Sequence, residues 1–366
     1  MKKAILITSL LVLAGGLCFT ALFLLPNAHN GSQKLVIHTN ASYSQVLDSI
    51  EHNNLVRSPF TFNLAARLTL YPRHIRNGKY VFDEGANNLQ ILRQLYRGQH
   101  YPVKFTFNNI RTKEQFIDKV DHHFMFEPEE LAALLNDPDF LANYGFNPQN
   151  CVAMMIPDSY EFYYNISDTD FVDKMYQYYL KFWTDERRQL AADAGLTPIE
   201  AVTLASIVEE ENFKEDEKAI IAGLYLNRLQ RGMKLQADPT VKFALGDFAK
   251  KRIYLIDTQV DSPYNTYLYE GLPPGPIRIP ATSTVDSVLH YMPHDYLFMC
   301  AKEDLSGYHN FAVTPQEHER NAAKYHKALD KMRDENTASA EEQRTPLTRK
   351  LKEQRTKNKV QNSESC

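Results

Sequence analysis

The stretch "GLTPIEAVTLASIVEEEN", residues 195–212, decides the fold of the second half of this 366-residue chain. Thr197 stands where a helix N-cap is expected, Pro198 follows at the first helical position, and Glu200 completes a capping box. The stretch therefore predicts a helix that runs from apolar residues straight into three successive glutamates, residues 209–211.

Helical phase divides these three glutamates. Glu209 and Glu211 lie four and seven residues after apolar residues, whereas Glu210 follows Thr203 and Ser206 on the polar face. A carboxylate beside buried surface is costly to ionise, so its pKa rises, as a general acid requires. The alternative is a solvated helix end, although the helix dipole disfavours glutamates there. The pattern does not separate Glu209 from Glu211.

The N-terminus predicts a membrane anchor. Residues 4–25 carry no charge and as a helix would span roughly 33 Å, enough for a bilayer core. The apolar run ends in bulky Leu24, Leu25 and Pro26, which favours an uncleaved anchor over a signal peptide. The lysines within residues 1–3 predict a cytoplasmic N-terminus and an extracytoplasmic remainder.

The rest of the chain reads as an α+β protein. Residues 26–34 are predicted to be a polar linker, and residues 35–107 a small α+β lobe. Residues 108–330 read as helices joined by ordered, aromatic-rich loops. Residues 331–366 are polar and charge-mixed, so they are predicted to be a disordered tail.

Composition excludes several classes of function. The formal net charge of -4 gives no basic footprint for nucleic acid. The four cysteines form no CxxC pair and the twelve histidines no HExxH, so no metal site is expected. Glycine-rich phosphate-binding motifs are missing from the sequence, and no cofactor is expected.

Four motifs together resemble the endolytic murein transglycosylases of the MltG or YceG-like family. They are "LASIVEEE", "LNRLQRGMKLQADPTVKFALG", "SPYNTYLYEGLPPGPI" and "HNFAVTPQEHERN". The resemblance covers roughly residues 35–329 and the anchor. Residues 108–116 depart from the family pattern, which has a Glu-Gly turn there.

The resemblance implies a function and a place. Members are anchored in the bacterial cytoplasmic membrane by a single span, carry a LysM-like lobe before a catalytic domain outside the cytoplasm, and cut nascent peptidoglycan. The glutamate after "SIV", Glu209, would be the catalytic acid and then base, leaving 1,6-anhydro-N-acetylmuramic acid ends and so ending strand growth. Peptidoglycan synthases are plausible partners by the same resemblance.

Two loops carry the candidate substrate contacts. "QADPTV" and "SPYNTYLYEGLPPGPI" combine amides, hydroxyls and aromatic rings with rigid backbone, which suits sugar rings and acetamido groups. The alternatives are a turn with an aspartate cap and tyrosines packed in the core. His309 is open between a cleft position and the commoner structural role. The candidate substrate-binding residues are Gln236, Asp238, Thr240, Tyr264, Asn265, Thr266 and Tyr267, together with Glu211.

Two other functions stay open at this point. A noncatalytic peptidoglycan-binding scaffold would use the lobe alone and would not need a desolvated carboxylate. A hydrolytic muramidase would need a second carboxylate, for which Asp238 is the candidate. The products of cleavage distinguish all three.

Overall fold

The computed structural model describes residues 2–29, 34–250 and 252–333. The chain forms two compact units, Met1–Phe182 and Trp183–Cys366, and each is described by itself. Both units mix helices with small two-stranded sheets, so the α+β class predicted from the sequence is confirmed.

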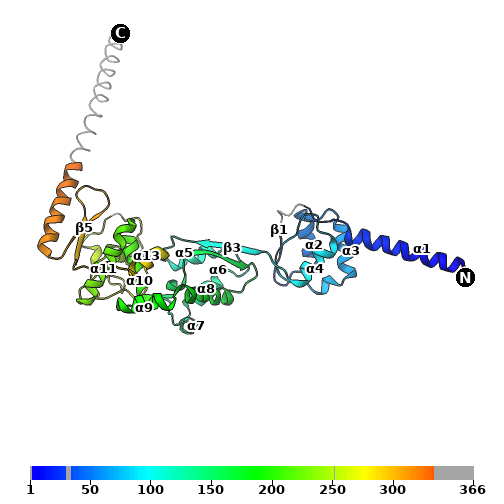
Figure 1. Cartoon of the computed structure of the whole chain (residues 1–366), viewed down its shortest axis with the longest axis horizontal. Helices are drawn as coiled ribbons and strands as arrows, with labels where there is room; N and C mark the ends of the chain where they lie inside the picture. Colours follow the sequence, from blue (N-terminus) through cyan, green and yellow to red (C-terminus); the bar gives the residue numbers. More distant parts are fainter. Residues whose placement is uncertain (1, 30–33, 251, 334–366) are drawn as a thin grey trace, which may run out of the picture. The chain divides into compact units, whose positions relative to one another are not determined.

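The first unit begins with a long apolar helix, α1 (Lys2–Phe19), which continues as a π-helical turn, η1 (Thr20–Leu24) (Figure 1). The segment Ile5–Leu24 has a mean hydropathy of 2.3 and is long and apolar enough to cross a membrane. Most of its side chains are exposed, as expected of a helix whose natural surroundings are lipid.

A small lobe follows this helix. Its sheet pairs β1 with β2 in antiparallel register, from Lys34 opposite Val81 to Ile37 opposite Gly78. Ser42 and Asn87 form capping boxes at the starts of two of its helices, as their sequences favour. The elements of the lobe are β1 (Lys34–Ile37), α2 (Tyr43–His52), α3 (Pro59–Leu68), η2 (Tyr71–Arg73), β2 (Gly78–Val81) and α4 (Asn88–Arg97).

The segment after the apolar helix differs from the predicted polar linker. Asn27 and Ala28 are buried, and both of their backbone N–H groups donate to Ala86 O, at 3.0 and 2.8 Å. Phe23 and Ala28 belong to the core of the lobe. Residues 26–29 are therefore part of the lobe rather than a linker. Their polar composition suggested exposure to water, but their backbone is paired with the lobe and Asn27 and Ala28 are buried.

The last residues of the predicted lobe, within 35–107, form a strand that pairs outside it. β3 (Pro102–Phe107) pairs antiparallel with β4 (Asp158–Tyr163), not with β1 or β2. Phe105 and Phe162, one from each strand, lie in an aromatic core with Phe116 and Phe171. The other elements here are α5 (Lys113–Val120), α6 (Pro128–Asn136), α7 (Pro138–Ala142), η3 (Cys151–Met154) and α8 (Asp168–Phe182).

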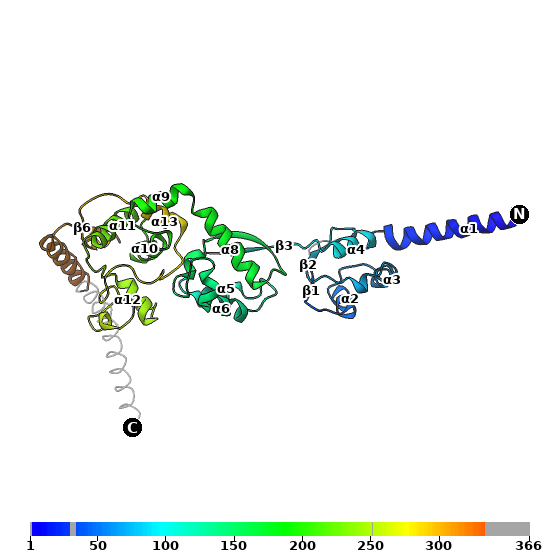
Figure 2. The ribbon, with the colours of Figure 1, turned by 90° about the horizontal axis from the view of Figure 1, so that it is seen from below.

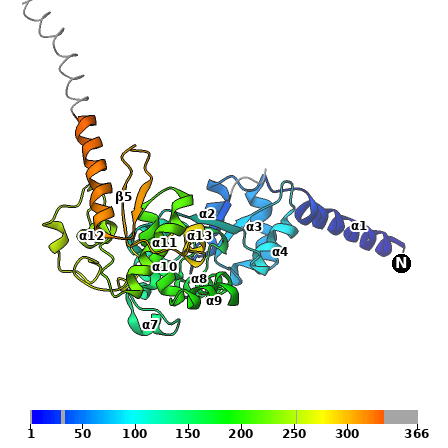
Figure 3. The same cartoon turned by 60° about the vertical axis from the view of Figure 1, so that its left-hand side comes forward.

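The second unit is built around α10 (Pro198–Glu211). Helices α11 and α13 both contact α10 and each other (Figures 1 and 3), and α12 contacts α10 as well (Figure 2). Its other elements are α9 (Asp185–Asp193), α11 (Glu215–Gln230), α12 (Asp238–Leu245), η4 (Asp257–Gln259), α13 (Thr282–Leu289), β5 (Phe298–Ala301) and β6 (His309–Ala312). Residues 315–333 are helical, and the rest of the predicted tail lies outside the described residues.

The start of α10 is as the sequence predicted, but its middle is not. Thr197 and Glu200 exchange the two hydrogen bonds of a capping box, so that prediction is confirmed. Residues 201–208, however, are buried without exception. Thr203 and Ser206 satisfy their hydroxyls inside the protein, on Ile199 O and Thr203 O, so α10 has no solvated polar face along this stretch.

Candidate active site

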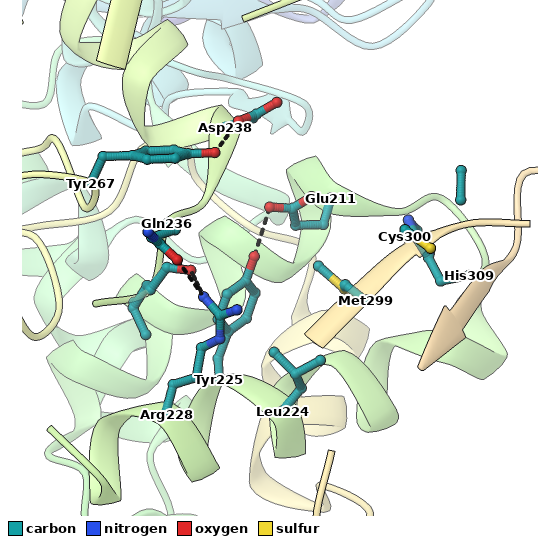
Figure 4. A pocket seen from close by; sticks show the side chains of 12 residues that line it. Glu211, Leu224, Tyr225, Arg228, Gln236, Asp238, Tyr267, Met299, Cys300 and His309 are labelled. Carbon is teal, nitrogen blue, oxygen red and sulfur yellow. Dashed lines mark hydrogen bonds between the residues drawn. The ribbon is translucent and has the colours of Figure 1, made fainter. Parts of the chain in front are cut away.

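A cavity of about 270 Å³ opens at the C-terminal end of α10 (Figure 4). It is bounded by α10, α11, the loop before α12, and the hairpin of β5 and β6. The lining residues are Glu211, Leu224, Tyr225, Arg228, Leu235, Gln236, Asp238, Tyr267, Met299, Cys300, Ala301 and His309.

Glu211 is the last residue of α10 and points at this cavity (Figure 4). The pKa of Glu211 is raised to about 7, mainly by burial and in smaller part by the nearby Asp238 carboxylate. The hydroxyl of Tyr225 donates to Glu211 Oε1 at 2.7 Å and acts in the opposite direction, because it stabilises the ionised form. Glu211 therefore holds a proton that it can release near neutral pH.

Helix α11 supplies Leu224, Tyr225 and Arg228 to the cavity, and the last two lie three residues apart on one face. The Arg228 guanidinium is fixed by backbone carbonyls: its Nε donates to Leu297 O at 2.6 Å and its Nη1 to Leu235 O at 2.8 Å. Arg228 thus ties α11 to the chain on either side of the cavity and sets the position of the loop that carries Gln236.

Asp238 and Tyr267 form the opposite wall. The hydroxyl of Tyr267 donates to Asp238 Oδ1 at 2.6 Å (Figure 4). Burial and this bond to a carboxylate raise the pKa of Tyr267, so the phenol stays protonated. Asp238 begins α12, where the helix dipole favours a negative charge. This wall presents a carboxylate and a phenol ring towards the cavity.

The hairpin of β5 and β6 closes the cavity with Met299, Cys300 and His309. The ring atom Nδ1 of His309 lies 2.9 Å from Glu217 Oε2, and its backbone N–H donates to Glu217 Oε1 at 2.9 Å. The buried Glu217 therefore fixes both the backbone and the ring of His309. His309 is at once a structural residue and a residue of the cavity wall.

Glu209 lies outside the cavity lining and is held by donors from the segment leading into α13. Its Oε2 accepts from Ala281 N and from Thr284 Oγ1, each at 2.7 Å, and its Oε1 lies 3.1 Å from Arg278 Nη2. Its side chain is 12% exposed. A carboxylate with a guanidinium, an amide and a hydroxyl as donors has the partners of a structural anion.

Glu210 is not the solvated residue that helical phase indicated. Its side chain is 15% exposed, and its Oε1 accepts from Arg278 Nη1 at 2.6 Å. Arg278, itself buried, bridges Glu209 and Glu210. The guanidinium offsets the cost of placing two acidic residues at the negative end of α10.

The structure brings together some of the predicted substrate-binding residues and not others. Gln236, Asp238 and Tyr267 line the cavity with Glu211. Thr240, Asn265 and Thr266 are buried, and each bonds to protein: Thr240 Oγ1 to Ala237 O and Thr266 Oγ1, and Asn265 Nδ2 to Val260 O and Thr258 O. Tyr264 packs its ring against Phe243, with 4.7 Å between centroids.

Sequence reasoning missed Tyr225 and the hairpin. Tyr225 is the tyrosine in "LYLNRL", one helical turn before Arg228 of the second family motif, and that spacing was the available signal. Met299 and Cys300 carried no such signal, because a short mixed strand gives no indication of what it faces.

Comparison with known proteins agrees with the motifs. Over 310 residues the chain is 27% identical to the endolytic murein transglycosylase of Bacillus subtilis (strain 168), covering 79% of this chain and 83% of that protein. Over 135 residues it is 35% identical to the endolytic murein transglycosylase of Streptococcus pneumoniae serotype 2 (strain D39), covering 36% of this chain and 24% of that protein.

A solved structure and a family model cover most of the chain. The crystal structure of a yceG-like protein from Listeria monocytogenes matches with a TM-score of 0.51 and 25% identity, over 78% of this chain and 97% of that one. The model of the YceG-like family matches residues 35–324. This match extends over well more than half of the sequence, and the chain belongs to the YceG-like family.

Proposed function

We propose that this protein is an endolytic lytic transglycosylase that cleaves the glycan strands of peptidoglycan, with Glu211 as its proton carrier. The names of its relatives support the reaction class. The observation that carries the choice of residue is a carboxyl group that faces a cavity and whose pKa is about 7. A group with that pKa gives and takes a proton with little cost at neutral pH.

The chemistry needs one carboxyl group. Protonated Glu211 donates to the oxygen that joins C1 of N-acetylmuramic acid to N-acetylglucosamine, and that C1–O bond breaks. The resulting carboxylate accepts the proton of the muramyl C6 hydroxyl, whose oxygen then bonds to C1. Glu211 ends the cycle protonated, no water is consumed, and the new end is 1,6-anhydro-N-acetylmuramic acid.

The proposal moves the catalytic role from Glu209, which the family resemblance implied, to Glu211. Glu209 accepts hydrogen bonds from Ala281 and Thr284 and pairs with Arg278, and it is not among the residues that line the cavity, which supports the choice of Glu211. Glu211 accepts a hydrogen bond from the Tyr225 hydroxyl, and its carboxyl group is within the cavity wall.

The other cavity residues have supporting roles in this proposal. Gln236 presents an amide to sugar hydroxyls and acetamido groups, and the ring of Tyr267 presents a face on which a sugar packs. Arg228 acts through Gln236 and the loop, since its Nε and Nη1 donate to backbone carbonyls that hold this loop. We do not assign substrate contacts to Thr240, Asn265 or Thr266, whose side chains are bonded inside the protein.

Asp238 is the second carboxylate that the hydrolytic alternative would need. A muramidase would use a second carboxylate to activate water. Asp238 lies in the same cavity but already accepts a hydrogen bond from the Tyr267 hydroxyl, which favours a role in shaping the wall.

The products test these alternatives directly. The full chain in detergent is incubated with un-crosslinked glycan strands in ¹⁸O-labelled water, and the new ends are weighed by mass spectrometry. We expect anhydro ends that carry no ¹⁸O. Reducing ends that carry ¹⁸O would establish the muramidase instead, and intact strands would leave a noncatalytic scaffold.

The remaining assignments concern the cellular location of the protein and the role of its first lobe. We propose that Ile5–Leu24 is a single-pass anchor in the bacterial cytoplasmic membrane, with the rest of the chain outside the cytoplasm; its hydropathy and the lysines before it support this. We also propose that the lobe from β1 to α4 is LysM-like and binds glycan. It contains a cavity of about 400 Å³ whose lining includes the polar residues His38, Asn40, Gln45 and Asp48.

That glycan-binding role has its own test. Asp48→Ala combined with Asn40→Ala should weaken pull-down of the full chain by insoluble peptidoglycan, while cleavage of short soluble strands by the second unit continues. Unchanged pull-down would contradict the role of this cavity. Peptidoglycan synthases fit as partners in such a location, and co-purification from membranes would test them.

A further inference from the structure

Helix α3 carries apolar side chains on two sides. One side, which includes Phe62, Ala65 and Ala66, is fully buried in the core of the lobe. On the other side Phe60 is 77% exposed, Leu64 42% and Leu68 62%. These three residues are spaced by four, so they form one stripe along the outer face of the helix. A stripe of large apolar residues facing water marks a surface that something else covers.

The stripe lies where the membrane helix enters the lobe. The turn η1 at the end of the span Ile5–Leu24 contacts both α3 and α4. Asn88 Nδ2 donates to Leu22 O at 2.8 Å, which fastens the end of the span to α4. Figure 2 shows α3 at the end of the lobe from which α1 leaves.

The start of α3 is also bound to the chain just beyond the span. Ser58, its N-cap, donates its N–H to Asn27 Oδ1 at 2.8 Å, and Arg57 N donates to Asn27 O at 2.6 Å. Asn27 is the third residue after Leu24. Phe60 is therefore held within a few residues of the point at which the chain leaves the bilayer, with no flexible linker between them.

The charged residues in the chain segment that carries the stripe all have one sign. Residues 57–82 contain four arginines and a lysine but no aspartate or glutamate. Arg57, Arg67 and Arg73 are exposed and stand before, within and after the helix. Arginines that flank an apolar helical face are the pattern of a segment lying in the headgroup region of a membrane, where phosphates are acceptors.

We propose that α3 lies in the interface of the same membrane that the span crosses, with Phe60, Leu64 and Leu68 among the acyl chains and the arginines at lipid phosphates. The proposal rests on the anchor assigned above. The bilayer is the occupant that the structure itself brings to this face, because the end of the span is fastened to α3 and α4. The lobe would then lie on the membrane surface at a fixed distance from it, rather than being joined to the span by a flexible linker.

Tryptophan quenching tests the depth of the stripe. Phe60→Trp is made in the full chain and reconstituted into liposomes of mixed zwitterionic and anionic lipid, with or without phosphatidylcholine brominated on its acyl chains. Wild type supplies the background, because Trp183 is the chain's single tryptophan and is buried in the second unit. Glu51→Trp, on an exposed position of α2 in the same lobe, is the matched control.

We expect the tryptophan of Phe60→Trp to emit at a shorter wavelength than a tryptophan in water. The brominated lipid should quench a large part of this emission, and it should not quench the emission of the control Glu51→Trp. Emission at the longer wavelength of a tryptophan exposed to water would overturn the proposal. Emission at short wavelength that bromine does not quench would also overturn it, because a protein would then cover the stripe. Flotation separates the two assignments: a chain that fails to float with liposomes refutes the anchor, whereas one that floats without quenching refutes only the role of α3.

Discussion

Glu209 and Glu210 at the end of α10 face Arg278, whereas Glu211, the next residue, faces a cavity and a tyrosine hydroxyl. The first two carboxylates share a buried cation, and Glu209 also accepts from two donors beside α13. Burial raises the pKa of the third, Glu211, to about 7, although the Tyr225 hydroxyl and the charges of Lys242 and Arg228 act to lower it. Three chemically identical side chains in a row thus have two different surroundings, and the two roles proposed above follow from them.

The helix produces this contrast by its rotation. Successive residues of an α-helix point about 100° apart, so consecutive side chains reach different neighbours. For Glu209 the neighbour is the segment from Arg278 to α13, and for Glu211 it is the open space beside α11 and α12. Burial alone does not decide which glutamate carries a proton; the number and charge of the donors decide it.

The comparison is tested most directly by replacing Glu211 and Glu209 in separate variants. Glu211→Gln keeps the shape and removes the titratable proton, so we expect cleavage to fall by at least about 10²- to 10⁴-fold. Glu209→Gln keeps its amide oxygen for Ala281 and Thr284 and should retain far more activity, although its pairing with Arg278 weakens. Release of anhydro ends from glycan strands measures both.

The folded state must be checked in each variant. Circular dichroism and binding to insoluble peptidoglycan serve this purpose, since neither depends on cleavage. If Glu209→Gln abolished cleavage in a folded protein while Glu211→Gln cut normally, the assignment implied by family resemblance would stand and ours would fall.

Arg278 tests the other half of the comparison. Arg278→Met removes the cation that two little-exposed carboxylates share, so we expect a loss of about 3–5 kcal/mol in the free energy of unfolding. Urea unfolding followed by the fluorescence of Trp183, buried in the second unit, measures it. Adding Glu209→Gln and Glu210→Gln to this variant should recover much of the loss. A variant as stable as wild type would show that Arg278 is not needed to hold Glu209 and Glu210.

The sequence predicted the frame of this site better than its details. The capping box at Thr197 marked the start of α10, and the motifs marked the loops that hold Gln236, Asp238 and Tyr267. These signals are local or are carried by several residues at once. The family itself was recognisable for the same reason, because the four motifs lie in sequence order over about a hundred residues.

The orientation of the glutamates could not be predicted, because the phase argument assumes one apolar face and one solvated face. α10 is buried all round over residues 201–208, and Thr203 and Ser206 face protein. Glu210 therefore follows a polar stripe that leads to Arg278 rather than to water. The partner is 68 residues away in the sequence, and no local pattern indicates it.

A difference in protonation should also appear as a pH-dependent stability. The pKa of Glu211 is about 7 in the folded protein against an ordinary glutamate value of 4.5, so the folded state binds this proton more tightly. The stabilisation is full below pH 4.5 and is lost as the pH rises through 7. At about 1.4 kcal/mol per pKa unit, wild type should lose up to about 3 kcal/mol relative to Glu211→Gln over this window.

Urea unfolding of both proteins between pH 4 and 8, again followed by Trp183, checks this. Comparison with Glu211→Gln removes the contributions of all other groups, which the two proteins share. A stability difference that stayed constant over the window would mean that Glu211 has an ordinary pKa in the folded protein.

Tyr225→Phe gives the smallest and most local effect. The Tyr225 hydroxyl donates to Glu211 and so favours the carboxylate; without it the pKa of Glu211 should rise above 7, by about one unit. Because the protonated form is the donor, the basic limb of the pH profile of kcat/KM should move to higher pH. Tyr267→Phe is the matched control, since its hydroxyl donates to Asp238, and it should move the limb less. A limb that stayed in place in Tyr225→Phe would mean that the proton measured there does not belong to Glu211, because no other change in this variant reaches that carboxyl group.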